Sequence, residues 1–131
     1  MLCWGRNDHG QIGDNSTTNR LTPASVSGLS SGVVGVFGGA SHTCAIKSGG
    51  SVYCWGKNTN GQLGDGTNVD KHVPTPVYGP LSGIVAMAAY EHTCALSSSG
   101  GLLCWGDNSW GQLGNGTNAQ QWIPTPVVGF P

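Results

Sequence analysis

The stretch HTCALSSSGGLLCWGDNSWGQLGNGT, residues 92–117, places a cysteine on each side of a Ser/Gly-rich tip and then enters a Gly/Asn-rich segment. Residues 42–67 read HTCAIKSGGSVYCWGKNTNGQLGDGT, nearly the same pattern 50 residues earlier. Self-similarity at a fixed period of this size is the sequence signature of a repeat architecture. The fold is therefore to be sought in one structural unit that recurs along the chain.

Alignment on the tripeptide CWG gives three units, which begin at Cys3, Cys54 and Cys104. Residues 54–81 and 104–131 are identical at 16 of 28 positions, including the segments GQLG and PTPV. The first unit follows the same pattern more loosely and has Asn-Ser where the later units have Gly-Thr.

Each full period predicts four short strands. Residues 33–39 and 84–90 are apolar and rich in small side chains, which favours inner strands packed closely by their neighbours. The cysteine-flanked segments predict a hairpin with a Gly-containing tip. The last strands, within 74–79 and 124–129, contain proline, which cannot donate to a ladder, so we expect them at a sheet edge. Four antiparallel strands in about 50 residues indicate a blade of a β-propeller.

Composition supports an all-β fold. Of 131 residues, 23 are Gly and only 8% are charged, which favours turns and strands over a helical bundle. The net charge is −1 with five Lys and Arg residues, so no basic surface is predicted to bind nucleic acid. No apolar run reaches the roughly 18 residues needed to span a membrane as a helix.

The cysteine spacing predicts two cross-strand pairs. Opposed residues of an antiparallel hairpin have a constant sum of residue numbers, which centres the two turns on Gly49 and Ser99. Directly opposed residues lie about 4.5–5.5 Å apart at Cα, within the range that a disulfide accepts. The predicted disulfides are Cys44–Cys54 and Cys94–Cys104.

Three other interpretations of these cysteines stay open at this point. They are reduced buried cysteines, a zinc site that adds His42 or His92, and nucleophilic catalysis by Cys44 or Cys94. Each hairpin offers at most three zinc ligands where four are usual, and nothing orients the nearby histidine as a base. Disulfides would indicate an oxidising compartment. In that case we expect the partner of Cys3 in a hairpin strand upstream of this chain.

The pattern HTCAL…G…CWGxNxxGQLGxGT…PxxV resembles the repeat of the regulator of chromosome condensation family, in its bacterial, cysteine-containing form. The resemblance spans nearly the whole chain, and it implies a seven-bladed β-propeller. We therefore expect a half blade at 3–28 and full blades at 33–79 and 84–129. A ring of seven such units needs about 350 residues, so we expect the chain to be a fragment whose open sheet edges favour self-association.

The resemblance also implies a function, because members of this family are known mainly as protein-binding propellers. We expect a non-catalytic protein-interaction scaffold that is secreted or located at the cell surface and that needs no cofactor or metal. One alternative is guanine-nucleotide exchange on a small GTPase, the activity of the founding member. Another is carbohydrate binding through exposed tryptophans.

Positions that differ between units indicate where a partner would bind. Trp110 stands where His9 and Asn60 stand, and Trp122 replaces a histidine of the second unit. Tryptophan is enriched among interface residues with large binding contributions. The alternative is that these tryptophans only cover prolines such as Pro124. The predicted binding patch consists of Trp110, Trp122, Asn60, Asp107 and Ser109.

The repeated tryptophans are expected to have a different role. Trp4, Trp55 and Trp105 follow the hairpin cysteine in every unit. A large apolar side chain at a fixed place in each repeat is typical of the interface between units. We therefore predict that these three side chains pack between blades.

Overall fold

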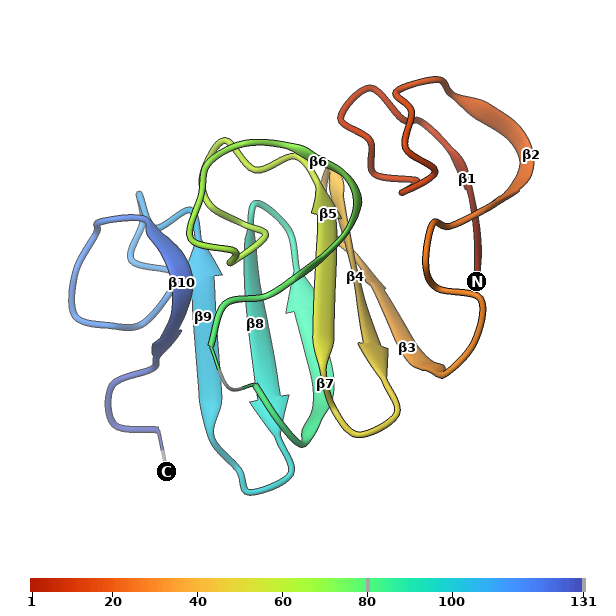
Figure 1. Ribbon diagram of the computed structural model, residues 1–131. Coiled ribbons are helices and arrows are strands. Elements are labelled where there is room, and N and C mark those ends of the chain that lie inside the picture. The colour runs from red at the N-terminus through yellow and green to blue at the C-terminus, as the bar shows by residue number, and fades with distance from the viewer. Residues whose placement is uncertain (80, 131) are drawn as a thin grey trace.

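The computed structural model describes residues 1–79 and 81–130, which form ten strands and contain no helix that could cross a membrane. The strands divide into one two-stranded and two four-stranded sheets (Figure 1). They are β1 (Leu2–Gly5), β2 (Arg20–Ser25), β3 (Val33–Gly38), β4 (His42–Lys47), β5 (Val52–Gly56), β6 (Lys71–Pro76), β7 (Ile84–Ala89), β8 (His92–Ser97), β9 (Leu102–Gly106) and β10 (Gln121–Pro126).

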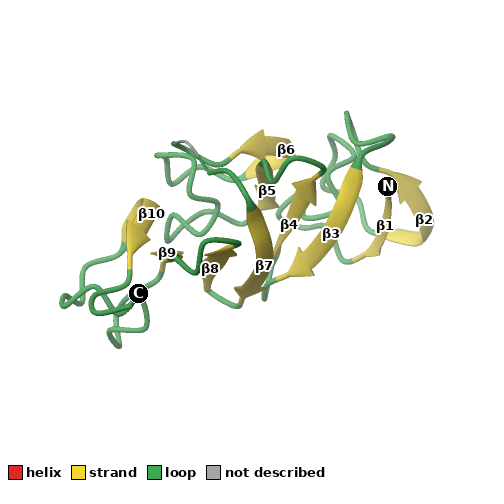
Figure 2. Cartoon of the chain, turned by 90° about the horizontal axis from the view of Figure 1, so that it is seen from below, coloured by secondary structure: helices red, strands yellow, loops and turns green. Residues whose placement is uncertain are grey.

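Both four-stranded sheets are antiparallel meanders, with the orders β3-β4-β5-β6 and β7-β8-β9-β10. Figure 2, seen from below, shows the three sheets following one another across the picture with β3 and β7 as neighbours. A four-stranded meander that stacks face to face on the next is the blade of a propeller. The all-β prediction is confirmed, and one half blade is followed by two full blades.

The central hairpin of each full blade has the predicted register. Cys44 lies opposite Cys54, and Cys94 lies opposite Cys104. In each pair the sulfur atoms are bonded and the Cα atoms are 4.1 Å apart. This Cα distance is slightly shorter than the ladder spacing predicts. The turn ends in Gly50, whose φ of 85° is the left-handed conformation expected there.

The proline-containing strands β6 and β10 are edge strands, as predicted. Each pairs with only one neighbour, so the missing amide hydrogen of proline breaks no second ladder. In both strands the register shifts within the ladder, and the long preceding segment folds back over the end of the blade (Figure 1).

The Asn-Ser departure of the first unit keeps the local backbone geometry. Asn15 has a φ of 63°, and the equivalent residues Gly66 and Gly116 have φ values of 82° and 81°. Asparagine tolerates the left-handed region better than other residues with a side chain. The substitution therefore leaves the turn intact.

The hydrophobic core lies between the sheets. We call the contact of the first unit with β3–β6 the first joint, and the contact of β3–β6 with β7–β10 the second joint. Trp55 is fully buried at the first joint and Trp105 at the second. Trp4, at the equivalent place of the first unit, is 63% exposed, and its packing between blades stays a prediction. No described segment lies against that side of β1.

Candidate functional site

A buried asparagine organises the long β5–β6 segment of the second unit. The side-chain nitrogen of Asn58 donates to Asp65 Oδ1 and to the carbonyl oxygens of Thr67 and Val69, at 3.0–3.1 Å. Its side-chain oxygen accepts the backbone N–H of Leu63 at 3.0 Å. One buried amide therefore fixes four points of a segment that has no strand of its own. The same arrangement recurs around Asn7 and Asn108.

The second joint is closed inside by a chain of hydrogen bonds. The Gln62 carbonyl accepts Thr93 Oγ1–H at 2.8 Å and Trp105 Nε1–H at 3.0 Å. Because Thr93 donates to Gln62, its oxygen accepts from His42 Nε2–H, at 2.8 Å. His42 Nδ1 is buried without a partner among the described residues. Burial, followed by the positive charges of His92 and Lys57, lowers the pKa of His42 to about 4, so its ring is neutral at pH 7.

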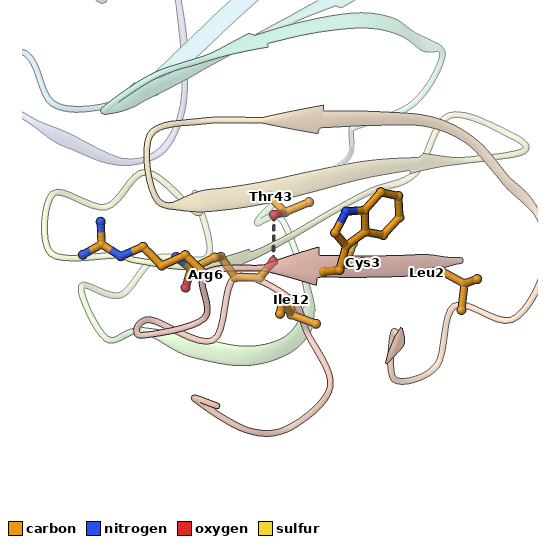
Figure 3. Close-up of a pocket in the computed structure, with 7 residues that line it drawn as sticks. Leu2, Cys3, Arg6, Ile12 and Thr43 are labelled. Carbon is orange, nitrogen blue, oxygen red and sulfur yellow. Dashed lines mark hydrogen bonds between the residues drawn. The ribbon is translucent and has the colours of Figure 1, made fainter. Parts of the chain in front are cut away.

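The first joint repeats only part of this arrangement. Thr43 Oγ1 donates to the Gln11 carbonyl at 2.8 Å, as the dashed line in Figure 3 shows. Trp55 Nε1, unlike the same atom of Trp105, has no hydrogen-bond partner within the described part of the chain. The two tryptophans thus occupy equivalent places, but only the indole N–H of Trp105 is hydrogen-bonded to a described residue.

Cys3 lines a pocket of about 280 Å³ beside the first joint (Figure 3). Its thiol is half-buried and forms no disulfide with another described residue. Burial raises the pKa of this thiol, and the nearby amino terminus partly offsets the effect. The expected partner in an upstream hairpin stays a prediction.

The two joints differ more strongly at the end where the β1–β2, β5–β6 and β9–β10 loops lie, which we call the loop end. At the first joint, His9 Nδ1 lies 2.8 Å from Asp70 Oδ2, and Asp70 Oδ1 accepts the backbone N–H of Asn58. At the second joint, Asn60 stands at the position of His9 and Gln120 at that of Asp70. No hydrogen bond between described atoms joins these two side chains. A polar pocket of about 380 Å³ lies there, lined by Asn60, Asp107, Ser109, Asn118 and Gln120.

Asp107 supplies the carboxylate of this pocket. Its Oδ1 accepts the backbone N–H and the hydroxyl of Ser109, at 3.1 and 2.9 Å, and its Oδ2 accepts Gln112 Nε2–H at 2.8 Å. Burial alone would raise the pKa of Asp107, but these hydrogen bonds and that from the Asn108 backbone together lower it. The group is therefore ionised at neutral pH.

The structure thus brings Asn60, Asp107 and Ser109 together but separates the two variable tryptophans from their pocket. Trp110 is 91% exposed and does not line it. By repeat equivalence, Trp110 occupies the place from which His9 reaches the following unit. Whether any of these residues binds a partner stays a prediction.

Trp122 is 38% exposed and packs on the second unit. A Cβ atom added to Gly61 would lie 2.3 Å from Trp122 Cδ1, and the Gly66 N–H donates to the Trp122 carbonyl at 2.9 Å. His72 packs on Gly10 in the same way at the first joint. Part of the Trp122 surface therefore belongs to the framework of the second joint.

Sequence reasoning missed Asn118 and Gln120 as pocket residues. Both are ordinary polar residues in a Gly/Asn-rich loop, so neither has a distinctive pattern of its own. The signal lies in the comparison of units, since an Asp at position 70 becomes a Gln at position 120. The change from Asp to Gln could be interpreted only once the structure showed that Asp70 pairs with His9 of the preceding unit.

Metal binding by the hairpin cysteines finds no support in the geometry. Cys44 and Cys94 are each bonded to another cysteine, and His42 is directed to Thr93. Among residues 1–79 and 81–130, no group of three His, Cys, Asp or Glu side chains is placed to hold an ion.

Solved structures share this architecture. The chain superposes on human WBSCR16 with a TM-score of 0.83 and 27% identity, over 96% of this chain and 34% of that one. It superposes on yeast RCC1 (Prp20) bound to Kap60 with a TM-score of 0.82 and 24% identity, over 99% of this chain and 34% of the other. The second likeness shows the fold alone.

Curated proteins match over part of the chain. Human Protein RCC2 is 42% identical over 77 residues, which are 58% of this chain and 15% of that protein. The Ultraviolet-B receptor UVR8 of Arabidopsis thaliana is 36% identical over 81 residues, which are 61% of this chain and 18% of the receptor. Human E3 ubiquitin-protein ligase HERC2 is 38% identical over 80 residues, which are 60% of this chain and 2% of the ligase. The chain therefore matches less than a fifth of the length of each of these relatives.

The sequence pattern of the family explains the repeated framework. The "Regulator of chromosome condensation (RCC1) repeat" matches residues 1–46, 49–96 and 99–131, and a second form of it matches residues 33–62. These matched units begin and end near the hairpin tips. The four-stranded sheets instead run from β3 to β6 and from β7 to β10. Since the match covers nearly every residue, the chain belongs to the regulator of chromosome condensation (RCC1) repeat family.

Proposed function

We propose that this chain is part of a non-catalytic propeller whose loops bind another protein. The observation that carries the proposal is the contrast between a repeated framework and variable exposed positions. Asn7, Asn58 and Asn108 are all fully buried and hold their loops in the same way. At an exposed loop position the units differ, and the third unit has Trp110, 91% exposed. A rigid scaffold that presents variable loop residues is the usual architecture of a binding surface.

Solved members of the family support protein binding as the general role. The structure of yeast Prp20p, 18% identical, is described together with its binding to Gsp1p and histones. The same yeast protein has been solved with Kap60. These partners are those of the yeast protein, and what this chain takes from the comparison is only the class of ligand.

Photocrosslinking tests the proposal. Benzoylphenylalanine at position 110 of the 131-residue chain should capture a protein that is not captured from position 21, where Leu21 is 96% exposed on β2. The captured protein is then purified and its Kd is measured by calorimetry. Trp110→Ala should weaken this binding by more than tenfold, because truncating a central interface tryptophan costs about 2 kcal/mol or more. Equal capture from both positions, or an unchanged Kd, would contradict the assignment of the surface.

The extracellular or cell-surface location belongs to the same proposal. Its support is the two cross-strand disulfides, since such bonds persist mainly in oxidising compartments. Intact-mass measurement of the native protein before and after reduction should show a gain of about four hydrogens. Protein isolated from its source with no such gain would remove this support.

Nucleotide exchange and carbohydrate binding are the alternatives. Exchange on a small GTPase takes place inside cells, where structural disulfides are rare, so the hairpins favour the scaffold. The exposed indoles, Trp110 above all, favour a sugar ligand. An assay of labelled GDP release and a glycan array would distinguish these activities from protein binding.

A further inference from the structure

Charge pairing along the chain has one exception. The chain has six Asp and Glu residues, and all lie in the described part. Five of them have a basic side chain within 4 Å, whereas Asp107 has none. The five pairs of basic and acidic side chains are Arg6–Asp8, His9–Asp70, Arg20–Asp14, Lys57–Glu91 and Lys71–Asp65.

The exception coincides with the polar pocket at the loop end of the second joint. Asp107 lines that pocket with three amide side chains and one hydroxyl, and no Lys, Arg or His side chain lines it. At the equivalent place of the first joint, an imidazole from one unit meets a carboxylate from the next. The first joint therefore contains its own basic partner, and the second holds an anion alone.

We propose that this pocket binds a guanidinium group, presented as an arginine side chain by the protein partner. The guest occupies the second joint as His9 occupies the first, and it contacts both units. Asn60 comes from the second unit, and Asp107, Ser109, Asn118 and Gln120 come from the third. The inference rests on the proposed protein-binding function and names the chemistry that the partner contributes.

The free hydrogen-bonding capacity of the pocket suits this group. Asp107 contributes negative charge rather than free acceptor positions, because its two oxygens already accept hydrogen bonds from Ser109 and Gln112. The side-chain oxygens of Asn60, Asn118 and Gln120 are acceptors that no described donor uses. A guanidinium offers five N–H donors in one plane and accepts none, whereas an ammonium offers three from a single point. Several acceptors spread around one anion therefore favour arginine over lysine.

Isosteric peptides test the inference. The ¹⁵N-labelled 131-residue chain is titrated with acetyl-Gly-Arg-Gly-amide and with its citrulline counterpart, which keeps the shape and loses the charge. The arginine peptide should cause saturable shifts of the Ser109 backbone amide and of the side-chain amides of Asn60 and Gln120. Its affinity should exceed that of the citrulline peptide by about tenfold, since hydrogen bonds to charged groups are roughly twice as strong as neutral ones.

Two variants and one control locate the interaction. Asp107→Asn should weaken the arginine peptide about tenfold, since it removes the charge with little change of shape. Gln120→Lys, which supplies an internal ammonium, should abolish the shifts even if Asp107→Asn proves unstable. Asp8→Asn makes the same charge change at the first unit, where Asp8 already pairs with Arg6, and should leave the affinity within twofold.

The results also separate this inference from the proposed function. Equal binding of the citrulline peptide, no saturable shift, or undiminished binding by Asp107→Asn or Gln120→Lys would each overturn the guanidinium site. A protein captured from position 110 would still support the scaffold in that case. Conversely, arginine-specific shifts without any captured protein would support the pocket and leave the scaffold unsupported.

Discussion

The two joints between units use one backbone arrangement and close it with different side chains. At both, a threonine of the later unit donates to a glutamine carbonyl of the earlier one, Thr43 to Gln11 and Thr93 to Gln62. At the loop end of the first joint, His9 is hydrogen-bonded to Asp70. The second is closed inside, where His42 extends the hydrogen-bond chain.

The comparison separates the contacts that stack the blades from those that differ between one joint and the other. Contacts that recur at both joints involve backbone atoms or residues repeated in the sequence, so they define how the blades stack. The contact of His9 with Asp70 involves positions that differ between the units, since Asn60 and Gln120 stand at the same positions of the second joint. The loop end of the second joint contains a polar pocket where the first joint has the pair of His9 with Asp70.

The largest expected effect is the loss of the second joint's core. Trp105 is fully buried between the sheets, so Trp105→Ala should lower the free energy of unfolding by about 3–5 kcal/mol. Urea denaturation measures this change. Trp110→Ala, at a 91% exposed position, is the matched control and should change stability by less than about 0.5 kcal/mol. Similar losses in both variants would show that Trp110 also belongs to the framework.

The interior of the second joint should make stability depend on pH. The pKa of His42 is about 4 in the folded state, against an ordinary value of 6.5. The unfolded chain therefore binds the proton more readily, and the His42 contribution is complete above pH 6.5 and is lost as the pH falls toward 4. The loss amounts to about 3 kcal/mol.

Urea titrations at several pH values, compared with His42→Gln, measure this contribution. The variant should have a flatter pH dependence between pH 6.5 and 4. His92→Gln, at the equivalent place on β8, removes one of the two charges that lower the pKa of His42 but keeps its burial, so it should reduce the pH dependence only in part. An identical profile for wild type and His42→Gln would refute the role assigned to the histidine.

Replacing each buried tryptophan by phenylalanine compares the joints directly. Trp105 Nε1 donates to Gln62, whereas Trp55 Nε1 is buried without a described partner. Both changes remove the same volume, but only Trp105→Phe removes a hydrogen bond. It should therefore cost about 1 kcal/mol more than Trp55→Phe in urea denaturation. Equal costs would mean that the polar satisfaction of the indole has no influence on stability.

The smallest effect concerns the loop ends. The double variant Asn60→His with Gln120→Asp transfers the His9–Asp70 pair to the second joint. Because both groups would be partly exposed, the gain should be at most about 1 kcal/mol, and smaller at high salt. A double-mutant cycle, with the two single variants as controls, isolates the coupling. No coupling would show that the loops of the second joint are spaced too differently to form the pair.

Much of the fold could be predicted from the sequence because its determinants are local or periodic. The 50-residue repeat predicted the blades, the hairpin numbering predicted which cysteines are bonded, and the prolines predicted the edge strands. Three of the five residues that line the candidate pocket, Asn60, Asp107 and Ser109, also belong to the binding patch that the sequence predicted. The sequence could not show that Trp110 lies outside the lining of that pocket, because it shows that a position varies but not which neighbouring unit the side chain faces.

What the sequence by itself determined is the unit: its strands, its register, its turns and its family, all of which depend on residues close together along the chain. What only the tertiary structure decided is the relation between units. The pairing of His9 with Asp70 spans 61 residues, and that of His42 with Thr93 spans 51. Such contacts depend on how one sheet rests on the next, so the residues involved become a site, or a closed joint, only after the blades have stacked.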